Sequence, residues 1–366
     1  MTYAAIAGAR LVIHGEYAHS RFFVIDVYDS KGNPYTPDFL DASLEPDPGS
    51  VNPFTTEGVS GPQYYTAYVE FAPMPAVPAN NTIYAATMTD GSTPNAGGLI
   101  ALRVYLPDNP IDYSGGVPLP QVSIELADGT TIPLRECDVV KENPFQPDIT
   151  ELLTDAAYPS AAPAVIPFPL AKNPPAWQTS TNPNLDETIG SSLPGGDPLP
   201  PTGVGLLTAP ANSYMNTRIS RQYGEIFVMR AKAPTSPDTR AGQWVGAPSQ
   251  VRYWSVCINS TLGATQTVAC LADHEFALDS DGDFTLVVSD PDHRPANAPN
   301  WLPLGDVYDG WIYMRQFLAA PDFQQAIANI PPGETAEESM GSYFPVSAYC
   351  SAAVFETSGA AGCLPQ

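Results

Sequence analysis

Positive charge is scarce in this sequence. Lysine and arginine number 15 against 39 aspartates and glutamates, which gives a net charge of -24. A surface of this sign repels the phosphate backbone of nucleic acids and anionic membrane surfaces, so neither is an expected partner. The sequence also contains no run of 18 apolar residues, and we therefore expect no membrane-spanning helix.

Signatures of the commonest enzymes are also missing. The sequence contains no G-x-S-x-G, H-E-x-x-H, P-loop or G-x-G-x-x-G motif, which argues against the commonest hydrolases, zinc proteases and nucleotide-binding proteins. The 41 prolines and 28 glycines disfavour long helices, because both residues weaken or interrupt helical segments. We therefore predict an all-β fold of short strands joined by turns, with few short helices.

A series of strand-like segments recurs in the same order in the two halves of the chain. Each segment is short, rich in β-branched and aromatic residues, and bounded by glycine, proline or asparagine. Because four matches in one order rarely arise by chance, we infer internal duplication and predict two related antiparallel β-sandwich or jelly-roll halves. The matched pairs are 8–15 with 224–231, 21–25 with 252–256, 65–69 with 284–288, and 98–103 with 310–315.

A proline-rich connector separates the predicted halves. We expect a first β-sandwich over 1–143, the connector over 144–212, and a second β-sandwich over 213–366 with a disulfide-stapled tail. Proline fixes φ and so lowers the entropy cost of laying an extended chain on a surface. The connector is therefore predicted to be ordered by contact, with Trp177 as its main anchor.

Two short helices are expected. Asp148 and Glu151 have the spacing of a capping box at the start of a helix. A second helix is predicted over 322–329, directly after Pro321.

The five cysteines indicate disulfides and therefore an oxidising compartment. Cys257 and Cys270 are separated by 13 positions, as are Cys350 and Cys363, and Cys137 is left over. Closing each of these loops stabilises the fold by roughly 3 kcal/mol in the chain-entropy model. A metal site is disfavoured because no C-x-x-C spacing occurs. We predict two disulfides and a secreted or cell-surface protein, with a signal sequence removed ahead of Met1.

One stretch of the second half resembles a known family. Asn300-Trp301-Leu302-Pro303 is followed by a glycine-led strand that carries Arg315 and then Phe317. This arrangement resembles the C-terminal signature of a widespread bacterial family known only as a domain of unknown function, over about Arg252 to Asp322. Phe317 stands where that family more often has tyrosine. The resemblance implies a β-sandwich and no particular chemistry.

Alternating aspartates suggest a cation site. Asp279, Asp281 and Asp283 follow one another through Asp-Ser-Asp-Gly-Asp, a spacing that can direct three carboxylates at one Ca²⁺ ion. Phe284 stands where an EF-hand loop needs glycine, so the pattern is incomplete. The alternative is an Asp-Gly hairpin turn, in which aspartate is favoured by the turn conformation alone.

Two groups of residues are candidates for acid/base chemistry. Asp290, Asp292, His293 and Arg294 lie close together in sequence, and a carboxylate beside an imidazole can orient it and raise its basicity. The alternative is a polar loop whose aspartates cap turns. The comparable polar group in the first half consists of His14, His19 and Asp26, which could be metal ligands, although no further ligand is evident.

Four arginines at repeated positions are the most distinctive polar feature. Arg21 matches Arg252, and Arg103 matches Arg315. They are candidates for bidentate binding of an anion, with Trp254 as a neighbouring ring that can stack on a ligand. The alternative is that a nearby aspartate neutralises each arginine and the pairs stabilise the ends of the sandwiches.

Two functions fit these observations. We prefer a secreted or surface, non-catalytic binding or structural protein that self-associates or holds a small-molecule or carbohydrate ligand between its halves. The alternative is a secreted hydrolase or lyase that uses an Asp/His pair with arginines in a cleft between the repeats. A largest pocket containing His293 or His19 together with an arginine would favour the enzyme. The sequence leaves the choice open and suggests no cofactor other than Ca²⁺.

Overall fold

The fold consists mainly of short strands, and the all-β prediction is confirmed. The computed structural model describes the chain except residues 135–170, 181–208, 261–266, 306–308, 332–333 and 366. The chain divides into two compact units. Unit 1 comprises Met1–Pro144, Gly203–Ala211 and Pro237–Pro248, and unit 2 comprises Phe145–Thr202, Asn212–Ser236 and Ser249–Gln366.

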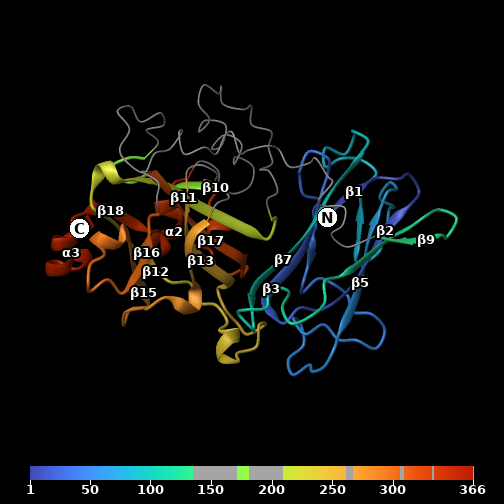
Figure 1. The fold of residues 1–366 in the computed structure, drawn as a ribbon, viewed down its shortest axis with the longest axis horizontal. Helices are drawn as coiled ribbons and strands as arrows, with labels where there is room; N and C mark the ends of the chain where they lie inside the picture. The colour runs from blue at the N-terminus through green and yellow to red at the C-terminus, as the bar shows by residue number, and fades with distance from the viewer. Residues whose placement is uncertain (135–170, 181–208, 261–266, 306–308, 332–333, 366) are drawn as a thin grey trace. The chain divides into compact units, whose positions relative to one another are not determined.

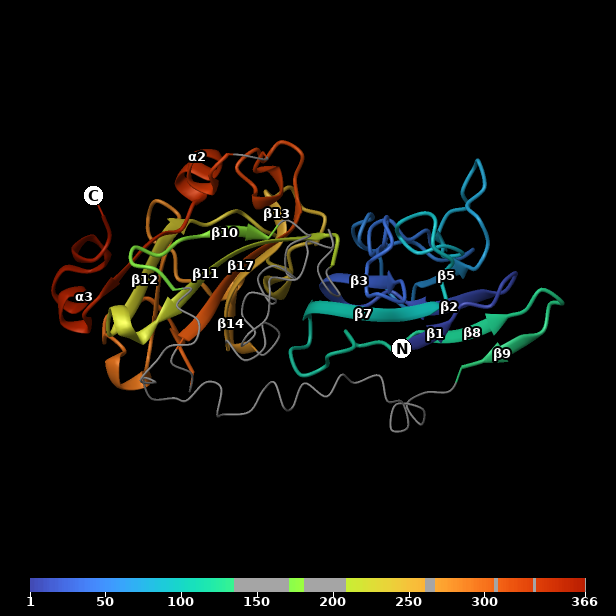
Figure 2. The same ribbon diagram turned by 90° about the horizontal axis from the view of Figure 1, so that it is seen from above.

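The described part of unit 1 contains two sheets. One has the strand order β1-β7-β3-β4 and the other β6-β5-β2-β8-β9, and Figure 2 shows β8 and β9 beyond β2. The strands are β1 (Thr2–Ala4), β2 (Arg10–Glu16), β3 (Ser20–Tyr28), β4 (Phe39–Leu40), β5 (Tyr64–Glu70), β6 (Thr82–Tyr84), β7 (Gly97–Pro107), β8 (Gln121–Glu125) and β9 (Thr131–Pro133).

The core of unit 1 lies between these two sheets. Phe23 and Ile25 of β3 join one buried hydrophobic cluster with Leu11 of β2 and Val69 of β5. Alternate residues along β2 and β5 are buried, as expected for strands that turn one face to a core. Gly98 on β7 has to be a glycine, because a Cβ atom there would lie 1.8 Å from the Tyr28 carbonyl oxygen.

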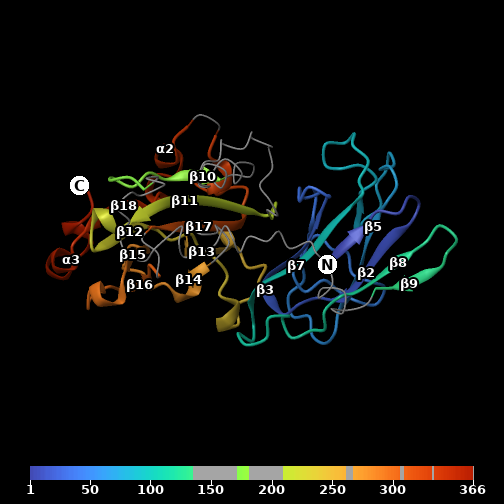
Figure 3. The same cartoon turned by 45° about the horizontal axis from the view of Figure 1, so that its top comes forward.

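Unit 2 also has two sheets in its described part. Their orders are β10-β11-β17-β13-β14 and β16-β15-β12-β18, and Figure 3 shows β10, β11, β17 and β13 side by side. The strands are β10 (Gln178–Ser180), β11 (Asn212–Ser220), β12 (Ile226–Lys232), β13 (Val251–Ser260), β14 (Thr267–Ala272), β15 (Asp283–Ser289), β16 (Asn300–Pro303), β17 (Asp309–Ala319) and β18 (Val346–Cys350).

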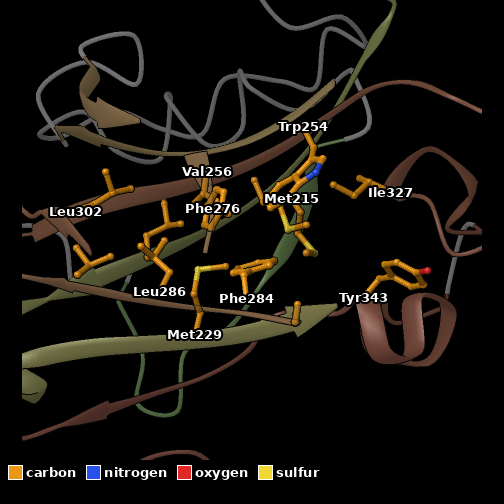
Figure 4. Close-up of a cluster of buried hydrophobic side chains, with 14 of the residues drawn as sticks. Met215, Met229, Trp254, Val256, Phe276, Phe284, Leu286, Leu302, Ile327 and Tyr343 are labelled. Atoms are coloured by element: carbon orange, nitrogen blue, oxygen red, sulfur yellow. The ribbon is translucent and has the colours of Figure 1, made fainter. Parts of the chain in front are cut away.

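Stacked aromatic rings occupy the core of unit 2. Trp254 of β13 lies against Phe276 at 4.7 Å and against Phe284 of β15 at 5.3 Å between ring centroids. Met229 of β12 and Leu286 of β15 close the cluster from the opposite sheet, as Figure 4 shows. Burial of these large side chains between the sheets supplies most of the hydrophobic stabilisation of a sandwich.

In each sheet, four strands of one unit correspond to four strands of the other in the same order, whereas β9 and β10 have no counterpart among the described residues. Strands β1, β7, β3 and β4 correspond to β11, β17, β13 and β14, and β6, β5, β2 and β8 correspond to β16, β15, β12 and β18. The pairing register of β3 with β7 agrees with that of β13 with β17. Phe22 faces Tyr105 in unit 1, and at the equivalent position of unit 2 Tyr253 faces Phe317. Even the left-handed backbone of Leu106 recurs, at Leu318, with φ of 48° and 47°. The gene duplication that would explain this agreement stays a prediction.

One pair of strands in each unit departs from the predicted antiparallel sheets. β5 and β6 run parallel, as do β15 and β16. The segments between these strands, 71–81 and 290–299, return along the unit so that both strands run in the same direction.

An asparagine has the same role directly before β6 and at the start of β16. Asn300 accepts the Ala277 N–H and donates to the Ala277 and Thr285 carbonyl oxygens, at 2.8 to 3.0 Å. Asn81 makes the same three bonds with Glu45 and Thr66. Each side chain thus satisfies backbone groups that no strand partner reaches.

Both predicted disulfides are confirmed. Cys257 bonds Cys270, its direct partner across β13 and β14, and Cys350 bonds Cys363 beyond β18. Cys137 lies outside the described residues.

The helices of unit 2 are short. α2 (Ala336–Met340) follows a capping box in which Thr335 accepts the Glu338 N–H, and α3 (Ala352–Ser358) is capped by Ser351. No helix in the part of the chain that the structure describes is long and apolar enough to cross a membrane. The expected helix at Asp148 lies outside the described residues.

The prediction of a helix over 322–329 was wrong. Only a 3-10 turn, Ile327–Asn329, forms there. Phe323, Ala326 and Ile327 are all buried, and Gln316 accepts the Ile327 N–H at 2.9 Å. Tertiary contacts therefore take up the groups that an isolated helix would use.

Residues 171–180 of the connector are described, and they contact the remainder of unit 2, the unit to which they belong. Trp177 packs against the unit 2 core and donates its indole N–H to Ser347 Oγ at 2.9 Å. Thr217 donates to the Ala176 carbonyl oxygen, and β10 pairs with β11 directly after it. The anchoring expected of Trp177 is thus present, while most of 144–212 lies outside the described residues.

Candidate functional site

A pocket of unit 1 is lined by four parts of the sequence. It has a volume of about 310 Å³, and we call it the unit 1 pocket. The residues that line it are Tyr17, Ala18, His19, Ser20, Pro53, Phe54, Thr56, Gly58, Val59, Ser60, Gly61, Gln63, Asp108, Thr239, Gly242, Gln243, Trp244 and Val245. Its size is at the lower end of the range of small-molecule sites, about 300–1,000 Å³.

The end of the β3–β7 ladder brings His19 and Asp108 together. Ser20 faces Pro107 across the ladder. His19 directly precedes Ser20, Asp108 directly follows Pro107, and both line the pocket. The Asp108 N–H donates to the His19 carbonyl oxygen at 2.9 Å. Leu106, just before this pair, has the left-handed backbone that it shares with Leu318, which costs a non-glycine residue roughly 1 kcal/mol.

The charge environment of Asp108 follows from this position. Its pKa is raised from the ordinary value, mainly because water around the carboxyl group is displaced. His19, Arg240 and Arg21 oppose the shift, since their positive charges favour the carboxylate. The pocket thus holds an acceptor carboxyl group beside an imidazole.

Loop Pro237–Pro248 forms one wall of the unit 1 pocket. Both sequence neighbours of this loop belong to unit 2, but the loop itself is counted with unit 1. The Arg21 side chain is fully buried and donates through Nε to Thr239 Oγ1 at 3.1 Å. Asp238 Oδ1 lies 3.8 Å from Arg21 Nη2. A buried guanidinium therefore holds the loop by two of its side chains.

The ring of Trp244 is fixed within that wall. Its indole N–H donates to the Pro53 carbonyl oxygen at 3.1 Å. Gly246 packs directly against the ring, since a Cβ atom there would lie 2.5 Å from Trp244 carbons. Phe54, on the facing loop, belongs to the unit 1 core and forms edge contacts with Phe23. The pocket accordingly offers a rigid aromatic surface.

Polar side chains around the pocket divide into two kinds. Gln63 accepts the Val51 N–H and donates to Ser60 and Gly61, so it organises the loop beneath it. Gln243 accepts the Asp238 N–H through Oε1, which leaves its amide NH₂ group for a ligand. Thr56 and Ser60 add hydroxyl groups to the lining.

A smaller pocket, the unit 2 pocket, contains the predicted Asp290 and His293. Its volume is about 160 Å³, and Arg221 lines it as well. Arg221 Nη1 donates to Asp290 Oδ2 at 2.7 Å, so the carboxylate faces a guanidinium. In the described residues, His293 meets Asp290 only through its backbone N–H, at 3.0 Å to the Asp290 carbonyl oxygen. Asp292 is exposed in the same turn.

At the equivalent place in unit 1, two aromatic rings lie against each other. Tyr3 occupies the position of Ile219, because Tyr3 faces Gly98 on β7 where Ile219 faces Gly310 on β17. Phe71 follows β5 where Asp290 follows β15. Tyr3 and Phe71 stack with centroids 5.6 Å apart and fill this end of the unit 1 core.

The repeated arginines have different surroundings. Arg103 pairs with the fully buried Asp26, whereas Arg315 lies over the Tyr214 ring at 5.5 Å. Arg252 is half-buried on β13, and Trp254 is a core residue rather than an exposed ring. His14 lies away from the pocket, beside Asp47 at 3.3 Å.

The alternating aspartates form a turn closed by an arginine. Arg230 on β12 pairs with Asp279 and, at 3.0 Å, with Asp283, and its guanidinium is the main cause that lowers the pKa of Asp279 to about 2. Asp279 also accepts the Asp281 and Asp283 N–H groups. Among the residues described, no three His, Cys, Asp or Glu side chains gather as a metal site. Calcium binding stays a prediction. A bound ion would have to displace Arg230 from Asp279 and Asp283.

Sequence reasoning missed Asp108 and Trp244, although signals for both exist. A proline and an aspartate follow the last repeated strand of each half, as Pro107-Asp108 and Pro321-Asp322. About 20 residues separate segments 224–231 and 252–256, against five between 8–15 and 21–25. A long insertion at one copy of a repeated position is typical of a functional loop.

Comparisons with known proteins give structural similarity alone. No family model matches the chain, and no curated protein matches it. The chain is similar to an uncharacterized protein from Burkholderia cenocepacia, with 16% identity and a TM-score of 0.44 over 86% of this chain and 71% of that one. It is also similar to a protein from Vibrio parahaemolyticus, with 13% identity and a TM-score of 0.41 over 93% and 85%.

Proposed function

We propose that this chain is an exported, non-catalytic binding protein whose unit 1 pocket takes a small, polar, carbohydrate-type ligand. Export is supported by the two disulfides, which form and persist in oxidising compartments. The carrying observation is the combination of a fixed indole with hydrogen-bonding groups in one pocket. Sugars present apolar C–H faces and rings of hydroxyl groups, and this combination matches both.

The preference for binding over catalysis rests on how the candidate acid/base groups are arranged. In the unit 2 pocket, Arg221 takes the Asp290 carboxylate that would have oriented His293. The unit 1 pocket contains His19, but no arginine is among its lining residues. One observation favours the enzyme alternative, namely the neighbouring His19 and Asp108, which could transfer a proton to a bound ligand.

Titration with simple sugars tests the proposal. Trp244 fluorescence and isothermal calorimetry would be followed while glucose, galactose, mannose, xylose and N-acetylglucosamine are added. We expect at least one sugar to bind, and Trp244→Ala to weaken that binding by tenfold or more, because stacking is lost. Trp177→Ala is the matched control, since Trp177 packs on unit 2.

Two results would contradict the proposal. Absence of saturable binding for every sugar and its oligosaccharides would exclude the ligand class. Chemical conversion of a bound sugar, abolished by His19→Ala and Asp108→Asn, would establish the enzyme alternative instead.

A further inference from the structure

A rigid loop beside the unit 1 pocket presents two large side chains to solvent. Ile111 and Tyr113 are 83% and 86% exposed, in the turn-rich segment that follows β7. Exposed apolar groups of this size bring no gain in hydrophobic stabilisation, and two of them on one ordered loop are available for contact with a ligand. The segment 109–115 is called the rim loop below.

The rim loop is held by its own hydrogen bonds. The Asp112 N–H donates to the Asn109 carbonyl oxygen at 3.0 Å, and the Gly115 N–H donates to the Asp112 carbonyl oxygen at 3.1 Å. The Asp112 carboxylate accepts the Ser114 N–H and hydroxyl groups at 3.1 and 2.8 Å. These bonds lower the pKa of Asp112, so they persist across neutral pH. The loop therefore presents Ile111 and Tyr113 at little entropic cost.

The same loop is continuous with the wall of the unit 1 pocket. His19 lines the pocket, and its N–H donates to the Gly115 carbonyl oxygen at 2.8 Å, while its carbonyl oxygen accepts the Asp108 N–H. Gly115 has a φ of +77° and lies against Ala18, another lining residue. Both ends of the rim loop thus join the pocket at His19.

We infer that the ligand of the unit 1 pocket is one unit of a neutral oligosaccharide or polysaccharide, whose next units lie on Tyr113 and Ile111. This inference rests on the proposed function and deepens it. An aromatic ring outside a pocket can stack on the apolar face of a second sugar ring, next to the one enclosed by Trp244. The net charge of -24 disfavours acidic polysaccharides, because like charges repel at every encounter.

The dependence of affinity on chain length tests the inference. Cello-, xylo- and manno-oligosaccharides of one to six units would be titrated into the full chain by calorimetry. We expect affinity for the series that binds to rise by tenfold or more between one and three units. Tyr113→Ala should remove this rise and leave the affinity for one unit within twofold, whereas Tyr113→Trp should retain it.

Val77→Ala is the matched control, because Val77 is an equally exposed apolar side chain of unit 1, at 84%. It should leave the whole series unchanged. Affinity that is independent of length, or a rise that Tyr113→Ala leaves intact, would overturn the inference while the proposed function stands. Lack of binding at every length would overturn both.

Discussion

Units 1 and 2 have the same strand order but stabilise equivalent strands in different ways. Asp26 on β3 and Cys257 on β13 occupy the same register position. Asp26 is fully buried and pairs with Arg103, whereas Cys257 forms a disulfide with Cys270. Without an aspartate at this position, the arginine equivalent to Arg103 contacts the Tyr214 ring instead.

This difference shows that one sandwich plan tolerates either an ion pair or a covalent bond at the same place. A buried ion pair is costly to desolvate, and it resists disruption mainly because loss of one partner leaves an uncompensated charge. A disulfide acts on the unfolded chain by restricting its conformations. The two units should therefore respond differently to charge removal and to reduction.

Arg103→Ala provides the largest expected effect. The change leaves the Asp26 carboxylate buried without its cation and should destabilise unit 1 by about 3–5 kcal/mol. Urea unfolding followed by hydrogen-exchange mass spectrometry resolves the two units, and unit 2 should be unaffected. The double variant Asp26→Asn with Arg103→Ala should recover part of the loss. A single variant as stable as the parent would show that the pair contributes nothing.

Removal of the cross-strand disulfide tests the other half of the comparison. Cys257→Ala with Cys270→Ala should destabilise unit 2 by roughly 3 kcal/mol, because the unfolded chain regains the freedom of a loop closed by two cysteines 13 positions apart. The measurement is again urea unfolding with exchange resolved by unit. Cys350→Ala with Cys363→Ala removes a disulfide that closes a loop of the same length and serves as the control. Equal loss of protection in unit 1 would contradict independent stabilisation.

Asp38→Asn should stabilise unit 1 at neutral pH. Burial raises the pKa of Asp38 to about 6 from 3.8, so the folded state holds its proton to a higher pH than the unfolded chain. Stability from this group is complete below about pH 3.8 and is lost as the pH rises through about 6. The variant should therefore gain roughly 2–3 kcal/mol at pH 7 and nothing near pH 3.5.

The control for this pH dependence is Asp90→Asn, also in unit 1. Hydrogen bonds from Thr93, followed by those from Ser92, lower the pKa of Asp90. Its carboxylate therefore contributes stability at neutral pH that is lost on acidification, the opposite direction to Asp38. Parallel pH profiles for the two variants would refute the assignment.

The smallest expected effect distinguishes the two asparagines. Asn300 is 5% exposed and Asn81 is half-buried, although both make the same three hydrogen bonds. Replacement by alanine leaves backbone groups without partners, and water can reach them more easily at Asn81. Asn300→Ala should cost about 1 kcal/mol more than Asn81→Ala in urea unfolding. Equal losses would mean that burial does not decide the cost.

The fold was predictable from local pattern, and the site only in part. Alternating apolar residues and turn residues identified the repeated strands, because these signals are local. Arg21 and His19 were recognised as candidates, but their partners Thr239 and Asp108 are 218 and 89 positions away. Residues that are close in sequence do not always interact. Asp290 and His293 were expected to form a pair, but the Asp290 side chain faces Arg221.

The sequence by itself determined the strand content, the disulfide pairs and the negative charge of this protein. Each depends on residue type and short spacing, which strand geometry and covalent reach convert directly into structure. Tertiary structure alone decided that Trp244 lines a pocket with His19, and that Trp254 is core rather than surface. Those outcomes depend on which faces the sheets bury and where a long loop packs, and neither is encoded within a few neighbouring residues.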